Sequence, residues 1–176
     1  MAITQQLITL IRNKAVSDSD LQRAAFFTLD AIANTLAERN SEPGKKLLTW
    51  AASQGGDAGR QALIAGSLTH ILETNDLHRA SVTHPDCVVV PTVFALAARE
   101  SSNGREILLA ILQGFEAMCR IGMAVGPAHY RIWHNTATCG PFGSAMAAAS
   151  LLKLSDLQAM LERNLQDSGS FLKLEP

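Results

Sequence analysis

The sequence predicts an all-α protein, a helical bundle forming a single domain over residues 1–176. Apolar residues recur at the three- and four-residue spacing of amphipathic helices in one segment after another. Serine, asparagine and aspartate, which cap helix N-termini, stand at the starts of several of these segments. No stretch shows the strict alternation of apolar and polar residues that is typical of a half-buried strand. These three observations together favour helices as the only regular elements.

The composition is that of an ordinary globular protein and argues against two classes of partner. Apolar residues make up 47% of the chain, charged residues 18%, and the formal net charge is -1. This balance provides no basic patch for nucleic acid or for an anionic membrane surface. The longest apolar candidate for a membrane span, 107–126, contains Gln113, Glu116 and Arg120. We therefore expect neither a nucleic acid nor a membrane as partner.

The cysteines and the N-terminus suggest a cytoplasmic protein without metal. The three cysteines, at 87, 119 and 139, are widely spaced and form no CxxC pair, so neither a zinc site nor a disulfide framework is indicated. Reduced thiols are the simplest interpretation. The first residues show no basic region followed by an apolar run, so we expect no signal peptide. We also expect no cofactor.

Four helices are expected in the first half of the chain, at residues 3–14, 20–38, 45–53 and 61–73. The second follows Ser17–Asp20, which offers N-cap residues and negative charge for a helix start. The fourth is apolar around most of its circumference, which indicates a buried helix. It leads directly into a histidine-containing loop.

The second half is expected to supply three inner helices and one further helix, at residues 85–99, 104–125, 138–153 and 155–164. The first begins with β-branched residues that would also suit a strand, but Pro91 argues against a central strand. Pro91 can kink the helix that we predict instead. Asn103 and Glu106 match a capping box at the start of the next helix. Small residues dominate Gly140–Leu152, so we expect helix backbones to approach closely there.

Most of the chemically versatile side chains lie in two predicted loops, 73–85 and 126–143, which hold four of the five histidines. Loops carry function more often than core positions do. In the first loop, Asp76, His78 and His84 lie within nine residues. A carboxylate close to an imidazole can share proton transfer, because histidine titrates near neutral pH. The spacing matches no metal-binding motif such as HExxH, so metal binding is not expected.

The second loop combines an imidazole with a helix start. His134 precedes Thr136 and Cys139–Gly140 in a stretch rich in hydroxyl groups. Backbone N–H groups and the positive end of a helix dipole favour a carboxylate or a phosphate at such a position. Cys139 near His134 would also suit a nucleophilic thiol. A small residue where packing is tight is the preferred interpretation of Cys139.

Each histidine also has a structural interpretation. His70 lies within the apolar helix predicted at 61–73 and is most simply a packed core or interface residue. In the first loop, Thr83 would serve as an N-cap and Pro85 as the first helical residue, with His84 a bystander between them. The functional and the structural interpretations both stay open at this point.

Four motifs in order resemble one family, and the similarity runs from about residue 5 to about residue 170. Thr83–Pro91 resembles an HPG-x-VV-x-P segment, and 104–126 resembles an SGRE…A…GYE…RIG…VG helix. His134–Gly143 resembles an H-x-T-x-x-x-G-x-F/x-G turn, and Leu151–Gln158 an LLGLs-x-xQ helix start. In this combination they are specific to the MmgE/PrpD family, which includes 2-methylcitrate dehydratase and cis-aconitate decarboxylase.

The resemblance implies a fold like the N-terminal part of that family's large helical domain. The family's active site lies between this domain and a smaller α+β lid, which would follow Pro176 together with later lysines. Carried over residue by residue, the resemblance gives the catalytic candidates Asp76, His84 and His134. The substrate-binding candidates are Arg79, Thr83, Thr136, Cys139 and Gly140. The family's D-x-D-D-T turn reads Glu-Thr-Asn-Asp-Leu here, at 73–77.

The resemblance implies a lyase acting on a small di- or tricarboxylic acid, as in 2-methylcitrate dehydration or in decarboxylation. His84 and Asp76 would transfer protons, while His134, Thr136 and the helix start at Gly140 would hold a substrate carboxylate. One alternative is a shortened, catalytically inactive relative that serves assembly. Another is an all-α module that only binds a carboxylate.

Two further expectations concern arrangement. Apolar helices in a chain that matches only part of a larger domain tend to be covered by a partner, so we expect a homodimer. The segments 85–99 and 104–125 should form an antiparallel hairpin that returns the chain to its starting end. We therefore expect the imidazoles of His84 and His134 to face one cavity, although fifty residues separate them.

Overall fold

The structure is a computed structural model that describes residues 3–154, and this part of the chain contains seven helices and no strand. The prediction of an all-α fold is confirmed. In chain order the helices are α1 (Ile3–Asn13), α2 (Asp18–Glu38), α3 (Glu42–Ala51), α4 (Ala58–His70), α5 (Asp86–Glu100), α6 (Gly104–Tyr130) and α7 (Asn135–Leu151). The helix expected at 155–164 lies outside the described residues.

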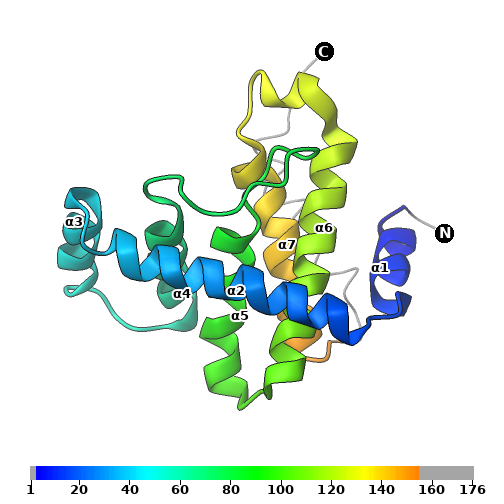
Figure 1. The fold of residues 1–176 in the computed structure, drawn as a ribbon, viewed down its shortest axis with the longest axis horizontal. Coiled ribbons are helices and arrows are strands. Elements are labelled where there is room, and N and C mark those ends of the chain that lie inside the picture. The colour runs from blue at the N-terminus through cyan, green and yellow to red at the C-terminus, as the bar shows by residue number, and fades with distance from the viewer. Residues whose placement is uncertain (1–2, 155–176) are drawn as a thin grey trace.

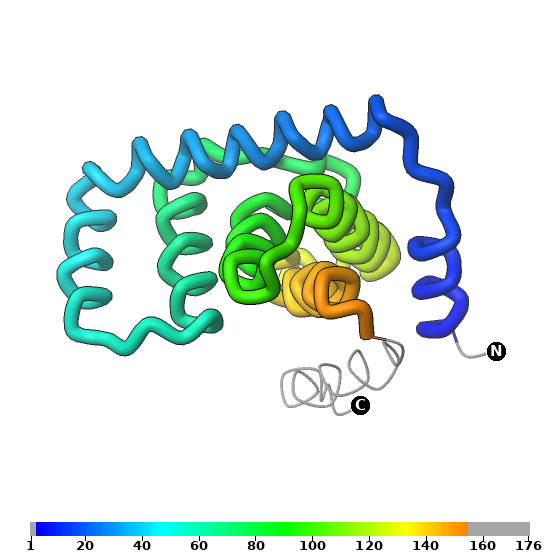
Figure 2. The backbone as a smooth tube through the Cα atoms, turned by 90° about the horizontal axis from the view of Figure 1, so that it is seen from below, coloured from blue at the N-terminus to red at the C-terminus, as the bar shows by residue number. Residues whose placement is uncertain are grey.

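Three helices form the centre, and they are the three segments predicted to be inner helices. Figure 2 shows α5, α6 and α7 end-on as a compact cluster, with α2 lying across one side of it. In Figure 1, α3 and α4 stand at one end of α2 and α1 stands at the other. The most extensive packing between two helices joins α6 to α7. The core therefore surrounds α7, whose residues enter both apolar clusters of the protein.

Small residues allow the central helices to approach closely. A Cβ atom added at Gly114 of α6 would lie 2.9 Å from the carbonyl oxygen of Gly143 in α7 and 2.6 Å from a methyl group of Val89 in α5. Side chains cannot occupy this space, so glycine is required where the three helices meet. The predicted close approach of the 140–152 segment is confirmed by this geometry.

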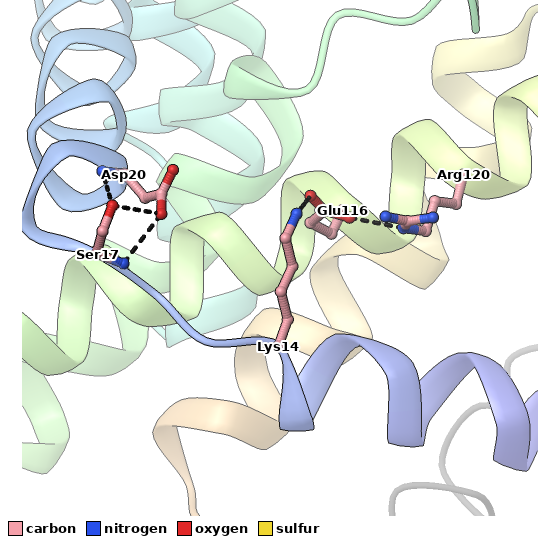
Figure 3. Close-up of polar contacts among 5 residues, drawn as sticks. All are labelled: Lys14, Ser17, Asp20, Glu116 and Arg120. Atoms are coloured by element: carbon pink, nitrogen blue, oxygen red, sulfur yellow. Dashed lines mark hydrogen bonds and ion pairs between the residues drawn. The ribbon is translucent and has the colours of Figure 1, made fainter.

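Local signals fix where several helices begin. Ser17 and Asp20 form a capping box at α2, and Asn103 and Glu106 form the predicted one at α6. In Figure 3 the Ser17 hydroxyl accepts from the backbone of Asp20, and the Asp20 carboxylate accepts in return from Ser17. The boundary of α2 follows from these reciprocal bonds.

An ion-pair network ties the chain between α1 and α2 to the middle of α6 (Figure 3). Lys14 lies 2.7 Å from Glu116, and Arg120 lies 2.6 Å from the other oxygen of the same carboxylate. Burial opposes the ionisation of Glu116, but the hydrogen bonds from Lys14 and Arg120 outweigh it and lower its pKa. Glu116 and Arg120 are an ion pair of residues four apart on α6, and Lys14 is the third charged group of the network.

The second predicted loop is largely helical, so the prediction of a loop over 126–143 was wrong. The structure continues α6 to Tyr130 and begins α7 at Asn135, which leaves only 131–134 between them. Gly126 interrupts α6 with a φ of 69°, a conformation that glycine adopts without strain. Pro127 then restarts the helix, because a first-turn residue does not need its N–H. Pro91 lies inside α5, which runs without a break from Asp86 to Glu100.

By length and composition α6 could cross a membrane, and it is the one described helix of which this is true. In the fold it packs against α7, α2 and α5. Of its most apolar stretch, 33% is buried inside the fold.

Candidate functional site

The first histidine loop is held against the start of α7 by hydrogen bonds. The backbone N–H of His84 donates to the Thr136 hydroxyl at 3.0 Å, and the Asn135 amide donates to the carbonyl of Ser81 at 2.7 Å. Within the loop, His78 and Thr83 pair through their backbones as a short bridge. The first turn of α7 therefore sets the position of His84.

Three histidines meet where α4, the first loop and α7 come together. The ring of His70, the last residue of α4, lies 4.7 Å from the ring of His84 and 6.3 Å from that of His134. The hairpin expected from the sequence does bring His84 and His134 to one end of the bundle, where both approach His70. We call His70, His84 and His134 the histidine cluster.

An open groove of about 480 Å³ lies beside this cluster, between α4, α5 and α7. His70, His134 and Thr136 provide polar groups on its lining, while Gly66 and Gly140 lie on its helical walls. His84 does not line the groove, so the expectation that His84 and His134 face one cavity was wrong. The His84 ring instead packs against His70, which lines the groove. The groove thus offers two imidazoles and a hydroxyl to a small molecule.

The start of α7 suits an anion. His134 is its N-cap residue and makes no side-chain capping bond, so the exposed imidazole is not used to close the helix. The first N–H groups of a helix lack partners within it and carry partial positive charge. Thr136 and Gly140 line the groove from this same helix. A carboxylate in the groove would face a favourable field.

Burial keeps His84 neutral. Its pKa is lowered, first by burial and then by the neighbouring His70 ring, while the backbone carbonyl of Asp76 and the charge of Asp86 act in the opposite direction. Its Nδ1 atom is buried and has no hydrogen-bond partner. Burial therefore favours the neutral form of this ring over the protonated form.

Asp76 lies in a cluster of carboxyl groups rather than on the groove. Its Oδ1 accepts from the backbone N–H of Asp86 at 3.2 Å. Burial, followed by the hydrogen bond and the charge of Asp86, raises the pKa of Asp76 to about 9. Burial and the same Asp86 also raise the pKa of Asp30 in α2. Asp76 therefore holds a proton at neutral pH and is suited to donate one, not to accept one.

Two substrate-binding candidates are buried away from the groove. Thr83 is 0% exposed and its hydroxyl pairs with that of Ser81 at 2.6 Å. Its role as an N-cap was also wrong, because Pro85 occupies that position without a side-chain bond. Cys139 is 1% exposed, and burial raises the pKa of its thiol. This environment does not activate a nucleophile, and it agrees with the preferred interpretation of Cys139 as a packing residue.

The remaining sequence candidates divide between the groove and the surface. Thr136 and Gly140 line the groove, whereas Arg79 is exposed on the turn of the first loop. His78 bonds to Ser81, and His129 bonds to Thr138 at 2.8 Å, so neither joins the histidine cluster.

Sequence reasoning did not include His70 and Asn75 in the site. His70 was interpreted as a packing residue, yet it is half-buried, lines the groove and contacts both other rings of the cluster. The available signal was its position as the last helical residue before the loop.

Among residues 3–154, no group of three or more histidine, cysteine or carboxylate side chains is arranged to hold a metal ion.

Comparisons with known proteins agree with the motifs. The model of the MmgE/PrpD N-terminal domain matches residues 5–161. A cis-aconitate decarboxylase-like protein of Aspergillus oryzae, oryM, is 36% identical over 106 residues, which cover 54% of this chain and 21% of that protein. The match thus spans about a fifth of the length of this relative. Because the family model covers most of the chain, this protein belongs to the MmgE/PrpD family and carries its N-terminal domain.

Proposed function

We propose that the protein acts as a lyase on a small di- or tricarboxylic acid, by dehydration or decarboxylation. The observation that carries the proposal is the meeting of three imidazoles with the start of α7 beside an open groove. Family membership and the name of the Aspergillus relative support the same reaction class. The groove volume of about 480 Å³ suits a molecule of this size.

The proposed mechanism assigns separate roles to the two ends of the site. A substrate carboxylate lies at the start of α7, near His134 and Thr136, where the helix dipole and the imidazole stabilise its charge. A neutral imidazole of the cluster removes a proton from the carbon next to that carboxylate. In a dehydration, the electron pair forms a C=C bond as the neighbouring hydroxyl leaves with a proton as water. A decarboxylation begins without this proton removal: the C–C bond to a carboxylate breaks to release carbon dioxide, and the electron pair left on the carbon takes up a proton.

A second candidate is a relative that binds a carboxylate without turning it over. The altered turn at 73–77 favours it. Asn75 is engaged by Asp86 and His70, and the Asp76 carboxyl group lies away from the groove. The groove and the histidine cluster would then serve recognition alone.

Titration of citrate or methylcitrate, followed by histidine NMR shifts, tests the proposal. We expect the wild-type cluster rings to shift at millimolar ligand, and His84→Ala and His134→Ala to weaken binding about tenfold or more, as for a lost charge-assisted bond. His129→Ala is the matched control, because that ring lies outside the cluster, and it should bind like wild type. Absence of any shift in the wild-type rings would remove the carboxylate site. Shifts without conversion of the ligand would favour the binding module.

We further propose that the protein is cytoplasmic, which its free thiols support. We also propose that it forms a homodimer, which an apolar stripe on the outer face of α2 supports. Phe26, Leu29 and Leu36 recur there at helical spacing and are 64%, 60% and 55% exposed. Exposed stripes of this kind tend to be covered by a partner. Light scattering should give twice the monomer mass for the wild type and the monomer mass for Phe26→Glu. A wild-type monomer at high concentration would contradict the dimer.

A further inference from the structure

His70 is joined to two buried polar residues on the side away from the groove. Its Nδ1 lies 2.9 Å from Oδ1 of Asn75, and the Asn75 amide nitrogen donates to Oδ1 of Asp86 at 2.5 Å. Asn75 is 8% exposed and Asp86 is 0% exposed. Asn75 and Asp86 are thus shielded from water, which strengthens the hydrogen bond between them.

The chemistry of the three groups fixes the position of one proton. A carboxylate only accepts hydrogen bonds, so the NH₂ group of Asn75 must face Asp86. The carbonyl oxygen of Asn75 then faces His70, and an amide oxygen also only accepts. Nδ1 of His70 must therefore carry the proton of that bond. In the neutral ring this leaves Nε2 as an unprotonated acceptor.

The other ring nitrogen is directed to accessible space. His70 lines the groove, and among the described residues Nε2 has no hydrogen-bond partner. Nε2 of His70 is not a buried atom without a partner, whereas Nδ1 of the neighbouring His84 is one. Solvent, or a ligand in the groove, therefore reaches it.

We propose that Asp86 and Asn75 are positioning residues that hold His70 as the Nδ1-protonated tautomer, and that its Nε2 is the acceptor for a hydroxyl or protonated carboxyl group of the ligand. The tautomer follows from the protein alone. The ligand contact rests on the proposed function, because it assumes that the groove receives a hydroxy acid or a polycarboxylic acid. The same arrangement makes His70 a third imidazole available to the reaction, next to His84.

Long-range ¹H–¹⁵N correlation NMR of the full chain, without ligand, tests the tautomer directly. It is recorded at a pH at which the His70 ring is neutral by its own titration, and the resonance is assigned with His70→Gln. We expect the nitrogen shifts of an Nδ1–H ring in the wild type. An Nε2–H ring in the wild type would overturn the proposal, and this measurement requires no destabilised variant.

Asn75→Ala separates positioning from packing. We expect this substitution to move the ring proton of His70 from Nδ1 to Nε2, because an unconstrained neutral histidine prefers the Nε2-protonated tautomer. The spectrum should stay that of a folded protein. Asn75→Ser supplies a second, smaller change if the alanine variant does not fold. Asn103→Ala is the matched control, since it removes a helix cap far from the site and should lower stability without changing the tautomer. An unchanged His70 tautomer in a folded Asn75 variant would mean that Asn75 is structural only.

Citrate titration of the same variants tests the ligand contact. We expect the His70 Nε2 resonance to shift on binding, and His70→Gln to weaken binding about tenfold. Binding with an unmoved Nε2 resonance would remove the ligand contact but leave the tautomer and the groove. If citrate binds to no form of the protein while wild-type His70 is Nδ1-protonated, the proposed function fails and the positioning by Asn75 stands.

Discussion

Valine in place of Gly114 is expected to destabilise the protein by about 3 kcal/mol or more, and thus to remove much of the stability of an ordinary domain. A Cβ atom at this position would lie 2.6 Å from a Val89 methyl group, 2.9 Å from the Gly143 carbonyl oxygen and 3.0 Å from the Ala147 methyl group. These neighbours belong to α5 and α7, so no single side chain can move aside to relieve the clash. Valine adds two methyl groups beyond the Cβ, and α6 must separate from α7 to admit them.

Urea unfolding followed by circular dichroism measures this effect. Gly104→Ala is the control, because Gly104 begins the same helix and an added Cβ would meet nothing within 4 Å. It should leave the free energy of unfolding unchanged or raise it by less than about 1 kcal/mol. Equal midpoints for Gly114→Val and the wild type would mean that the three central helices are farther apart than the structure places them.

Helices could be predicted from the sequence because their signals are local. The apolar spacing of each segment and the capping box at Asn103 lie within a few residues of the structure that they determine. The same local reasoning failed at Gly126, where a glycine and a proline were interpreted as a loop. Pro127 can restart the helix after one residue, and the bond of His129 to Thr138 in α7 ties the last turn of α6 to the next helix. No local pattern contains that contact.

The site was predicted less completely, because it depends on contacts between distant segments. The resemblance supplied His84 and His134, and the hairpin argument placed them at one end of the bundle. His70 could not be chosen from its own helix, since its role follows from rings that come from two other elements. Asp76 was expected to handle protons on the groove, but Asp30 in α2 and the start of α5 enclose it in a buried carboxyl cluster.

That cluster gives the second large expected effect, on the dependence of stability on pH. Burial and the neighbouring Asp86 raise the pKa of Asp76 from its ordinary value of 3.8 to about 9. Between these two values the folded protein keeps a proton that the unfolded chain releases. Unfolding therefore releases a proton, and raising the pH favours the unfolded state. This contribution to stability is fully present below the lower pKa and is lost as the pH rises through the upper one.

Asp76→Asn isolates the effect, because an asparagine oxygen can accept from the backbone of Asp86 while its NH₂ group replaces the carboxyl proton. Relative to this variant, the free energy of unfolding of the wild type should fall by about 1.4 kcal/mol per pH unit within the window. From about pH 6 to about pH 8, the variant should gain about 2.7 kcal/mol over the wild type. Asp18→Asn changes an exposed carboxylate and should preserve the wild-type slope. Parallel stability curves for the wild type and Asp76→Asn would show that Asp76 is ionised in the folded protein and that the buried carboxyl cluster does not retain its proton.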